Sequence, residues 1–432
     1  MTCHTNEYSD PNKISISLGD DKGYHYKRFF EQGLNALLAD PHFLLLYVPE
    51  NGVKMQIIRP SSNPHHLERI MKMMNEETRD IPSFYYALSH LWGISESNRH
   101  LWIDIGNYVD DENGQPVDPV SMRPEKRDPL LALLKDHPGS YWWIDVLCAR
   151  TDTPLDIMGD IYSCCYECIV MIDCEPDLIP QLYAMMDADE AFPNYCWVLE
   201  NRNLDDLLPY KQLYDDKYPQ MIDLLYALMQ SQWWQRVWTW QEMALPVGGV
   251  RLMAETGTHR SLNNTITVDD LGRFYNAVFV INEYEYNRQL QESKESTEWL
   301  NVRTVLHWLF DIFRARRSNN QRIKNKKNAR IFYFLICSLG KSTRRCMDPV
   351  DYVYGVLGMF HFKIPRMTDP NTVWQLFLAE LDNYMMDFKD KKFSWGRITG
   401  ISDNAYQIDV LKAKNMADLY NDLLVVVEDG DQ

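Results

Sequence analysis

The residues best suited to chemistry lie in one tryptophan-rich stretch, Ser231–Glu242. The stretch carries four tryptophans, the guanidinium of Arg236 and the carboxylate of Glu242, and it contains neither Pro nor Gly. We predict that it ends a continuous helix running from about residue 219 to 244. Helical spacing would then put four side chains on one stripe: Trp234, Gln235, Trp238 and Glu242. A carboxylate beside a wall of indole rings suits a flat ligand ring, although periodicity alone favours ordinary packing.

The elements that must position this stretch are predicted buried strands. Apolar runs over residues 84–93 and 141–148 predict two strands. A predicted helix over 154–165 and a third strand over 169–173 complete the strand–helix–strand signature of a parallel sheet. Ligands of such sheets bind beyond the carboxyl ends of the strands. We therefore expect four residues near that edge: Ser89, Trp92, Gly93 and Asp145.

Composition restricts the class of protein. The chain has 432 residues, which favours two or three domains, with 45% hydrophobic and 24% charged residues. A formal net charge of -17 argues against general binding to nucleic acid or anionic membranes. We expect no membrane span and no signal peptide, because no apolar run is long enough and residues 1–20 are polar. Nine cysteines, an odd number, indicate reduced thiols and a cytoplasmic protein.

The pattern along the chain predicts three parts. Residues 1–80 should form an N-terminal hairpin and helices that pack on the core, and residues 81–250 the parallel-sheet domain. Residues 251–432 should be a mainly helical C-terminal region. A basic stretch at about 314–330 is interpreted as a linker, the alternative being a nuclear-import or nucleic-acid patch.

Other constellations are weaker candidates for sites. Ser89, His90 and Asp145 supply the residue types of a hydrolase triad, but adjacent strand residues point to opposite faces, and no nucleophile elbow is present. No Gly-rich phosphate-binding loop is recognisable. The cysteines at 164, 165, 168 and 174 include one Cys-x-x-Cys pair, which could suggest zinc, but they fit core thiols better. We predict no metal site.

Four segments in order carry a family resemblance. They are Tyr86-Ala-Leu-Ser-His-Leu-Trp-Gly93, Trp143-Ile-Asp-Val-Leu-Cys148, Ile157-Met-Gly-Asp-Ile-Tyr162 and Trp234-Gln-Arg-Val-Trp-Thr-Trp-Gln-Glu242. Together they resemble the fungal heterokaryon-incompatibility (HET) domain, and residues 345–358 resemble a segment that often follows it. One turn departs from the family. Ala149, Arg150 and Thr151 stand where Ile-Asn-Gln is usual, and Pro154 stands where the family has Gln.

The resemblance implies an α/β fold, a TIR-like or flavodoxin-like parallel sheet of about four or five strands flanked by helices. Many TIR domains cleave NAD with one glutamate in a motif resembling Trp-x-x-x-x-Glu, and Glu242 matches by motif order. NAD is then the substrate, and no cofactor is implied. Glu242 would stabilise an oxocarbenium ion and Trp238 would stack a ring. Ser89, Trp92 and Gly93 would hold ribose or phosphate, and Asp145 would orient a hydroxyl.

Three hypotheses stay open at this point. The resemblance implies fungal non-self recognition and programmed cell death, a form of innate immunity, carried out by NAD hydrolysis. The alternative is a non-catalytic signalling or oligomerisation module, which the altered 149–154 turn favours. An inert structural relative is a third. Glu242 and Asp145 would then make structural contacts only, and Trp92-Gly93 would simply turn the chain. The expected partner is a second copy or a separate sensor or incompatibility protein.

Overall fold

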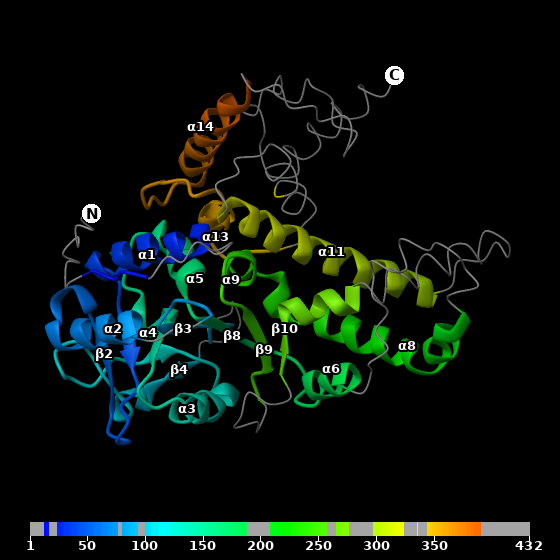
Figure 1. The fold of residues 1–432 in the computed structure, drawn as a ribbon, viewed down its shortest axis with the longest axis horizontal. Helices are drawn as coiled ribbons and strands as arrows, with labels where there is room; N and C mark the ends of the chain where they lie inside the picture. Colours follow the sequence, from blue (N-terminus) through cyan, green and yellow to red (C-terminus); the bar gives the residue numbers. More distant parts are fainter. Residues whose placement is uncertain are drawn as a thin grey trace, which may run out of the picture.

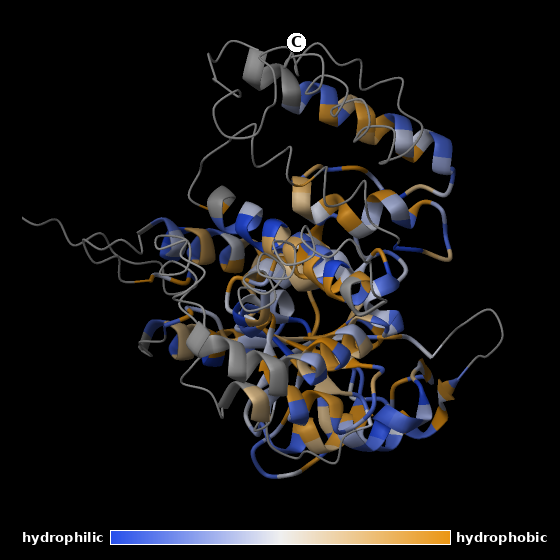
Figure 2. Cartoon of the chain, turned by 90° about the vertical axis from the view of Figure 1, so that its right-hand side faces the viewer, coloured by the Kyte–Doolittle hydropathy of each residue, from blue (hydrophilic) through white to orange (hydrophobic). Residues whose placement is uncertain are grey.

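The computed structural model describes residues 13–16, 24–76, 80–93, 100–187, 208–256, 265–275, 297–323, 335 and 344–389. Across these residues an eight-stranded mixed sheet lies at the centre, with helices on both faces (Figure 1). Hydrophobic residues gather around the sheet and hydrophilic residues on the outer surfaces of the helices (Figure 2). The prediction of an α/β fold is confirmed at this level, although the sheet is larger than the four or five strands expected.

The sheet is built around four parallel strands. Its order is β10-β9-β8-β3-β7-β1-β2-β5, and β7, β3, β8 and β9 run parallel. The strands are β1 (Leu45–Tyr47), β2 (Met55–Ile58), β3 (Tyr85–His90), β5 (Val109–Asp110), β7 (Tyr141–Ile144), β8 (Glu167–Ile172), β9 (Val250–Ala254) and β10 (Ile266–Thr267). A separate pair is formed by β4 (Leu101–Trp102) and β6 (Val120–Ser121). Numbered along the chain, the parallel strands have the spatial order 2-1-3-4.

The predicted N-terminal hairpin is present and extends the same sheet. β1 pairs antiparallel with β2 and, on its other side, antiparallel with β7. β2 in turn carries β5 as a parallel neighbour. The hairpin therefore shares hydrogen bonds with the parallel strands as well as packing contacts.

The main helices of the described residues pack around this sheet. They are α1 (Tyr24–Ala39), α2 (Pro64–Glu76), α3 (Arg127–Lys135), α5 (Ile157–Cys164), α6 (Leu178–Asp187), α8 (Leu208–Met229), α11 (Thr297–Ile323), α13 (Asp351–Phe360) and α14 (Pro370–Lys389). Figure 1 shows α1 and α5 on one side of the sheet and α3 and α6 on the other. Residues 195–199, whose sequence pattern favours a further short strand, lie outside the described residues.

The tryptophan-rich stretch corrects the prediction of one continuous helix. α8 ends at Met229, a short 3-10 helix η5 covers Gln232–Gln235, and α9 spans only Thr239–Ala244. Between them Arg236 is extended and forms a parallel bridge with Arg345. The helix breaks because partners distant in sequence satisfy its backbone groups, which periodicity cannot reveal.

The second strand is also shorter than predicted. β7 ends at Ile144, and one helical turn, α4 (Asp145–Cys148), follows. The Asp145 carboxylate accepts a hydrogen bond from the Val146 amide at 2.7 Å. A side chain that accepts a hydrogen bond from a nearby amide offers the backbone an alternative to the strand ladder.

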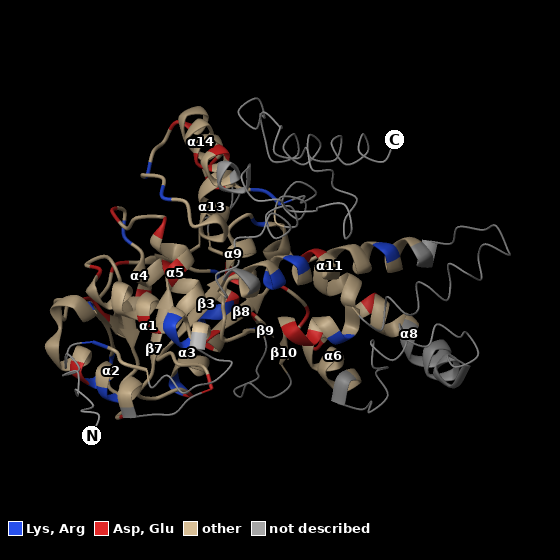
Figure 3. Cartoon of the chain, turned by 45° about the horizontal axis from the view of Figure 1, so that its top comes forward, with Lys and Arg blue, Asp and Glu red and all other residues tan. Residues whose placement is uncertain are grey.

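The first part of the predicted basic linker, residues 314–323, belongs to α11, and residues 324–330 lie outside the described residues. Arg316, in this helix, is buried. Its guanidinium pairs with Asp269 at 3.0 Å and donates to the Met243 carbonyl at 3.0 Å. Arg316 thus ties α11 to the end of α9. Acidic and basic residues are interspersed over the described elements (Figure 3).

Two further observations concern the core and the surface. The cysteines at 164, 165 and 168 are buried free thiols and Cys174 is half-buried, so the core-thiol interpretation is confirmed. Burial raises the pKa of the Cys174 thiol to about 12. Within the described ranges, none of the helices combines the length and apolar character needed to cross a bilayer.

Contact between α5 and α13 gives a first prediction. A Cβ built on Gly358 would lie 2.6 Å from the Gly159 Cα, so this crossing admits no side chain. We expect Gly358→Ala to lower the free energy of unfolding by about 1–3 kcal/mol, because the helices must separate. Urea unfolding measures the change, with Tyr352→Ala as the control, since Tyr352 in the same helix is exposed. A midpoint equal to that of the native chain would contradict this packing.

Candidate functional site

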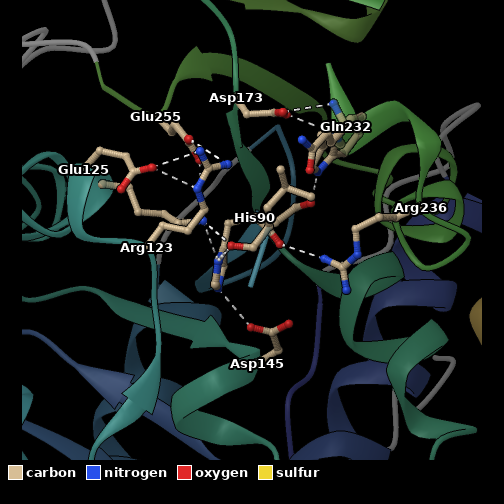
Figure 4. A network of polar contacts seen from close by, with 12 residues as sticks. His90, Arg123, Glu125, Asp145, Asp173, Gln232, Arg236 and Glu255 are labelled. Carbon is tan, nitrogen blue, oxygen red and sulfur yellow. Dashed lines mark hydrogen bonds and ion pairs between the residues drawn. The ribbon is translucent and has the colours of Figure 1, made fainter. Parts of the chain in front are cut away.

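Polar side chains collect at the carboxyl edge of the parallel strands. An acidic residue directly follows each of β7, β8 and β9, namely Asp145, Asp173 and Glu255, and β3 itself ends at His90. Figure 4 shows these four side chains at one end of the sheet. This is the edge at which ligands of open parallel sheets bind.

Asp145 is held by groups at the end of β3. Its carboxylate lies 3.1 Å from His90 Nε2 and accepts a hydrogen bond from the indole of Trp92. Burial alone would raise the Asp145 pKa, but His90 and Trp92 together lower it below its usual value. Because a carboxylate can only accept hydrogen bonds, His90 Nε2 carries the proton. The structure thus brings Asp145 and Trp92 together, as predicted, and adds His90.

The other face of His90 meets a buried lysine. Lys126 Nζ lies 3.3 Å from His90 Nδ1, donates to the Leu91 carbonyl and lies 3.6 Å from Glu255 Oε2. Desolvation lowers the Lys126 pKa to about 8, although Glu255 opposes that shift. Desolvation and then Lys126 lower the pKa of His90, so its neutral form is favoured.

Glu255 completes this network at the end of β9. It pairs with Arg123 at 3.0 Å, and Arg123 also pairs with Glu125 at 2.9 Å (Figure 4). The composition of residues 106–129, rich in Pro, Asp, Asn and Gly, predicts an exposed loop, yet Lys126 is 0% exposed. That prediction is wrong at Lys126, because this segment folds back over the sheet edge and supplies the cations that neutralise a buried carboxylate.

Ser89 and Glu242 form a second polar cluster. The Ser89 hydroxyl donates to Glu242 Oε2 and accepts from the Trp233 indole at 2.8 Å. All three side chains are buried, Glu242 at 5% exposure. The predicted neighbours Ser89 and Glu242 are therefore in direct contact.

The ionisation of Glu242 is strongly perturbed. Burial raises its pKa from 4.5 to about 7, against the opposing effects of Arg236 and the Ser89 hydrogen bond. Arg344 also favours the charged form, whereas Asp145 disfavours it. A carboxyl group with this pKa exchanges its proton near neutral pH, which is the range useful for catalysis.

Two more predicted residues have different surroundings. Trp238 hydrogen-bonds the carboxylate of Asp351, and the Glu242 amide donates to the Trp238 carbonyl at 3.5 Å, one helical turn away. The expected stripe is interrupted at the extended Arg236, so Trp234 and Gln235 do not continue it. Gly93 packs against backbone, because a Cβ there would lie 2.5 Å from the His100 carbonyl oxygen. Its glycine is required by this close approach.

Arg236 and Asp173 join the tryptophan-rich stretch to the strand ends. Arg236 donates to the His90 carbonyl at 3.1 Å. The Asp173 carboxylate accepts from the backbone amides of Gln232 and Trp233 at 3.0 and 3.1 Å. Asp173 therefore caps η5 from another element and fixes Trp233 next to Ser89.

Sequence reasoning missed several members of the site. They are Lys126, Asp173, Trp233, Glu255 and Arg344, whereas His90 was considered only as part of a rejected hydrolase triad. One usable signal was present, since three apolar runs are each interrupted or followed by an acidic residue, at Asp145, Asp173 and Glu255. Trp233 and Arg344 carried no signal, because their positions depend on the break in the helix and on the distant 344–345 segment.

Part of the chain is similar to a known protein family. Residues 85–242 match the family model described as Heterokaryon incompatibility protein (HET). No curated protein and no solved structure matches. The HET segment, as we call residues 85–242, begins with the first residue of β3 and ends at Glu242. It indicates a role in heterokaryon incompatibility. The HET segment contains both Ser89 and Asp145, whereas Glu255 and Arg344 lie beyond its end.

The unusual turn within the HET segment is held by its own hydrogen bonds. The Arg150 amide donates to Thr153 Oγ1 at 2.8 Å, and the Thr153 amide donates to the Arg150 carbonyl at 3.1 Å. The Arg150 guanidinium pairs with Glu112 at 3.1 Å. The turn therefore uses its polar groups within the protein.

The raised pKa of Glu242 predicts that the protein loses folding stability as the pH rises. Unfolded glutamate loses its proton near 4.5, whereas folded Glu242 keeps it up to about 7. The contribution of this residue to the free energy of unfolding is therefore highest at low pH, where Glu242 is protonated in both states, and it falls as the pH rises from about 4.5 to about 7. We expect Glu242→Gln to raise the free energy of unfolding at pH 8 by about 3 kcal/mol and to change it little at pH 4.5.

Urea unfolding at the two pH values measures this effect. Glu50→Gln is the matched control, because Glu50 is largely exposed and pairs with Arg69 at the surface. A stability difference between Glu242→Gln and the native chain that stays constant from pH 4.5 to 8 would show that Glu242 ionises normally.

Proposed function

We propose that this protein acts in heterokaryon incompatibility by hydrolysing the bond between nicotinamide and ribose in NAD, with Glu242 as the catalytic carboxylate. The observation that carries the proposal is the buried Ser89–Glu242 pair at the carboxyl ends of the parallel strands. A carboxylate retained in a buried position at a cost in stability is a common mark of a functional site.

The position of the pair supports a nucleotide substrate. The parallel strands have the order 2-1-3-4, and in doubly wound sheets of this order the ligand binds where the chain changes direction, between the first and third strands. Those strands are β3 and β8, whose ends carry Ser89 and Asp173. We infer a TIR-like arrangement from this order together with the motif resemblance.

The chemistry needs one well-placed negative charge. The bond from ribose C1′ to the nicotinamide nitrogen breaks with its electron pair on nitrogen, so the cationic ring leaves neutral and needs no general acid. Water then adds to C1′ and releases a proton. Ionised Glu242 would stabilise the oxocarbenium ion between these steps. A ribose hydroxyl is the same kind of donor as the Ser89 hydroxyl and would replace it on the carboxylate.

Trp92 and Asp145 suit the rest of such a substrate. The Trp92 ring is 43% exposed at the sheet edge and its indole is anchored on Asp145. An exposed indole held in a fixed orientation offers a face on which a base or nicotinamide ring stacks. In this proposal Trp92, and not Trp238, stacks the ring.

A second function has its own supporting observation. Glu242 is 5% exposed and its Oε2 already accepts the Ser89 hydroxyl, which is how a purely structural carboxylate is satisfied. This favours a non-catalytic module that signals by self-association or through a sensor partner.

Nicotinamide release distinguishes the two functions. We expect the purified chain to release nicotinamide from NAD at high protein concentration. Glu242→Ala should reduce kcat by at least about 100-fold, because it removes the negative charge that stabilises the cationic transition state. Glu50→Gln serves as a control. A folded native chain that releases none, also after forced oligomerisation, would favour the signalling module. Release unaffected by Glu242→Ala would remove Glu242 from the mechanism.

The pH dependence provides an independent check. Because only ionised Glu242 stabilises a cation, kcat/KM should rise with pH and level off above a midpoint near 7, the pKa of this residue. Rates measured from pH 5 to 9 give the profile. A flat profile, or activity that falls through pH 7, would be inconsistent with a carboxylate acting in its charged form.

A further inference from the structure

Residues 344–358 lie against the turn that leads into Glu242, although they follow it by about a hundred residues in the chain. The Arg345 amide donates to the Gln235 carbonyl at 2.5 Å, and the Arg345 carbonyl accepts from the Val237 amide at 3.0 Å. These two bonds hold Arg236 extended between η5 and α9. The break in the predicted helix thus coincides with this strand-like contact.

The Arg344 side chain hydrogen-bonds both ends of the same turn. Its Nη1 donates to the Arg236 carbonyl at 2.8 Å and to Thr239 Oγ1 at 2.7 Å. Its guanidinium lies 4.2 Å from the centre of the Trp240 ring, within cation–π range. Thr239 and Trp240 are the first two residues of α9, the helix that carries Glu242. The position of Glu242 therefore depends on Arg344.

Helix α13 adds a second contact to the turn. A Cβ built on Gly355 would lie 2.7 Å from Val237 Cγ1 and 3.1 Å from the Trp238 amide nitrogen. The carboxylate of Asp351, at the start of the same helix, hydrogen-bonds Trp238. Close backbone packing and a polar anchor therefore fix the turn from the C-terminal side.

We propose that residues 344–358 complete the Glu242 site and that Arg344 is a positioning residue, which holds the 236–239 turn so that Glu242 meets Ser89. The HET segment alone, which ends at Glu242, would then not be the working unit of this chain. Only the activity arm of the test below rests on the proposed NAD hydrolysis.

Electrostatics supports the same assignment. Arg344 favours the ionised form of Glu242, and Glu242 in return opposes the desolvation that lowers the Arg344 pKa to about 9. Arg236, Asp145 and the Ser89 hydroxyl also act on Glu242, so loss of Arg344 removes one of two nearby cations.

The experiment compares two neighbouring arginines in the full chain. Arg344→Met removes the half-buried guanidinium, and Arg345→Met removes an exposed one while leaving the backbone pairing intact. The carboxyl carbon of Glu242, labelled with carbon-13 and assigned by its absence in Glu242→Gln, is titrated by NMR. We expect the midpoint to move upward in Arg344→Met and to stay unchanged in Arg345→Met.

Activity provides the second arm. We expect Arg344→Met to lower kcat for nicotinamide release by at least about tenfold with little change in KM, because a misplaced carboxylate loses transition-state stabilisation. Arg345→Met should stay within about twofold of the native rate, because the exposed Arg345 side chain does not act on Glu242. If the native chain releases no nicotinamide, the proposed NAD hydrolysis fails and the titration alone decides the role of Arg344.

A third variant separates the charge of Arg344 from its geometry and tests whether the effects come from misfolding. Arg344→Lys keeps the charge but cannot bond both acceptors and stack on the ring, so its titration midpoint should stay near the native value while kcat falls. Circular dichroism verifies that each variant is folded. Folded Arg344→Met and Arg344→Lys chains with native midpoint and native kcat would overturn the proposal.

Discussion

The hydrogen bond between Ser89 and Glu242 is the contact on which the site depends. It joins the end of β3 to α9 across 153 residues of sequence and is closed by the indole of Trp233. Because this carboxylate is buried, the charges and donors around it decide its ionisation, and small displacements of either partner change its chemistry. Asp173 fixes Trp233 from β8, so the contact requires β3 and β8 to be adjacent in the sheet.

The polar cluster around His90 gives the same sheet edge a single arrangement. Lys126, His90 and Asp145 form a continuous series of contacts that ends on Glu255 at β9. Buried ion pairs contribute little net stability, because desolvation offsets their attraction. Their partners are nevertheless fixed, since removing one would leave a buried charge unpaired. We infer that this series keeps the ends of β3, β7 and β9 in register.

Local patterns in the sequence were sufficient for much of the fold. Apolar runs located β3, β7 and β8, the periodicity of residues 24–39 gave α1, and the turn before Met55 gave the hairpin. The motif resemblance assigned Ser89 and Glu242 to one site, but it did not predict their direct contact. Helix periodicity failed at Arg236, where Arg345 takes the backbone bonds. The burial of Lys126 was equally invisible, because its counter-charge, Glu255, lies far along the chain.

The position of Arg344 along the chain also determines when the site can be completed during protein synthesis. A ribosome adds about 5–20 residues per second, so Arg344 follows Glu242 by roughly 5 to 20 s of synthesis. During that interval the HET segment is already made, but the turn before α9 lacks the guanidinium that holds it. An activity harmful to the cell would thus stay incomplete on the growing chain until the C-terminal region has been added.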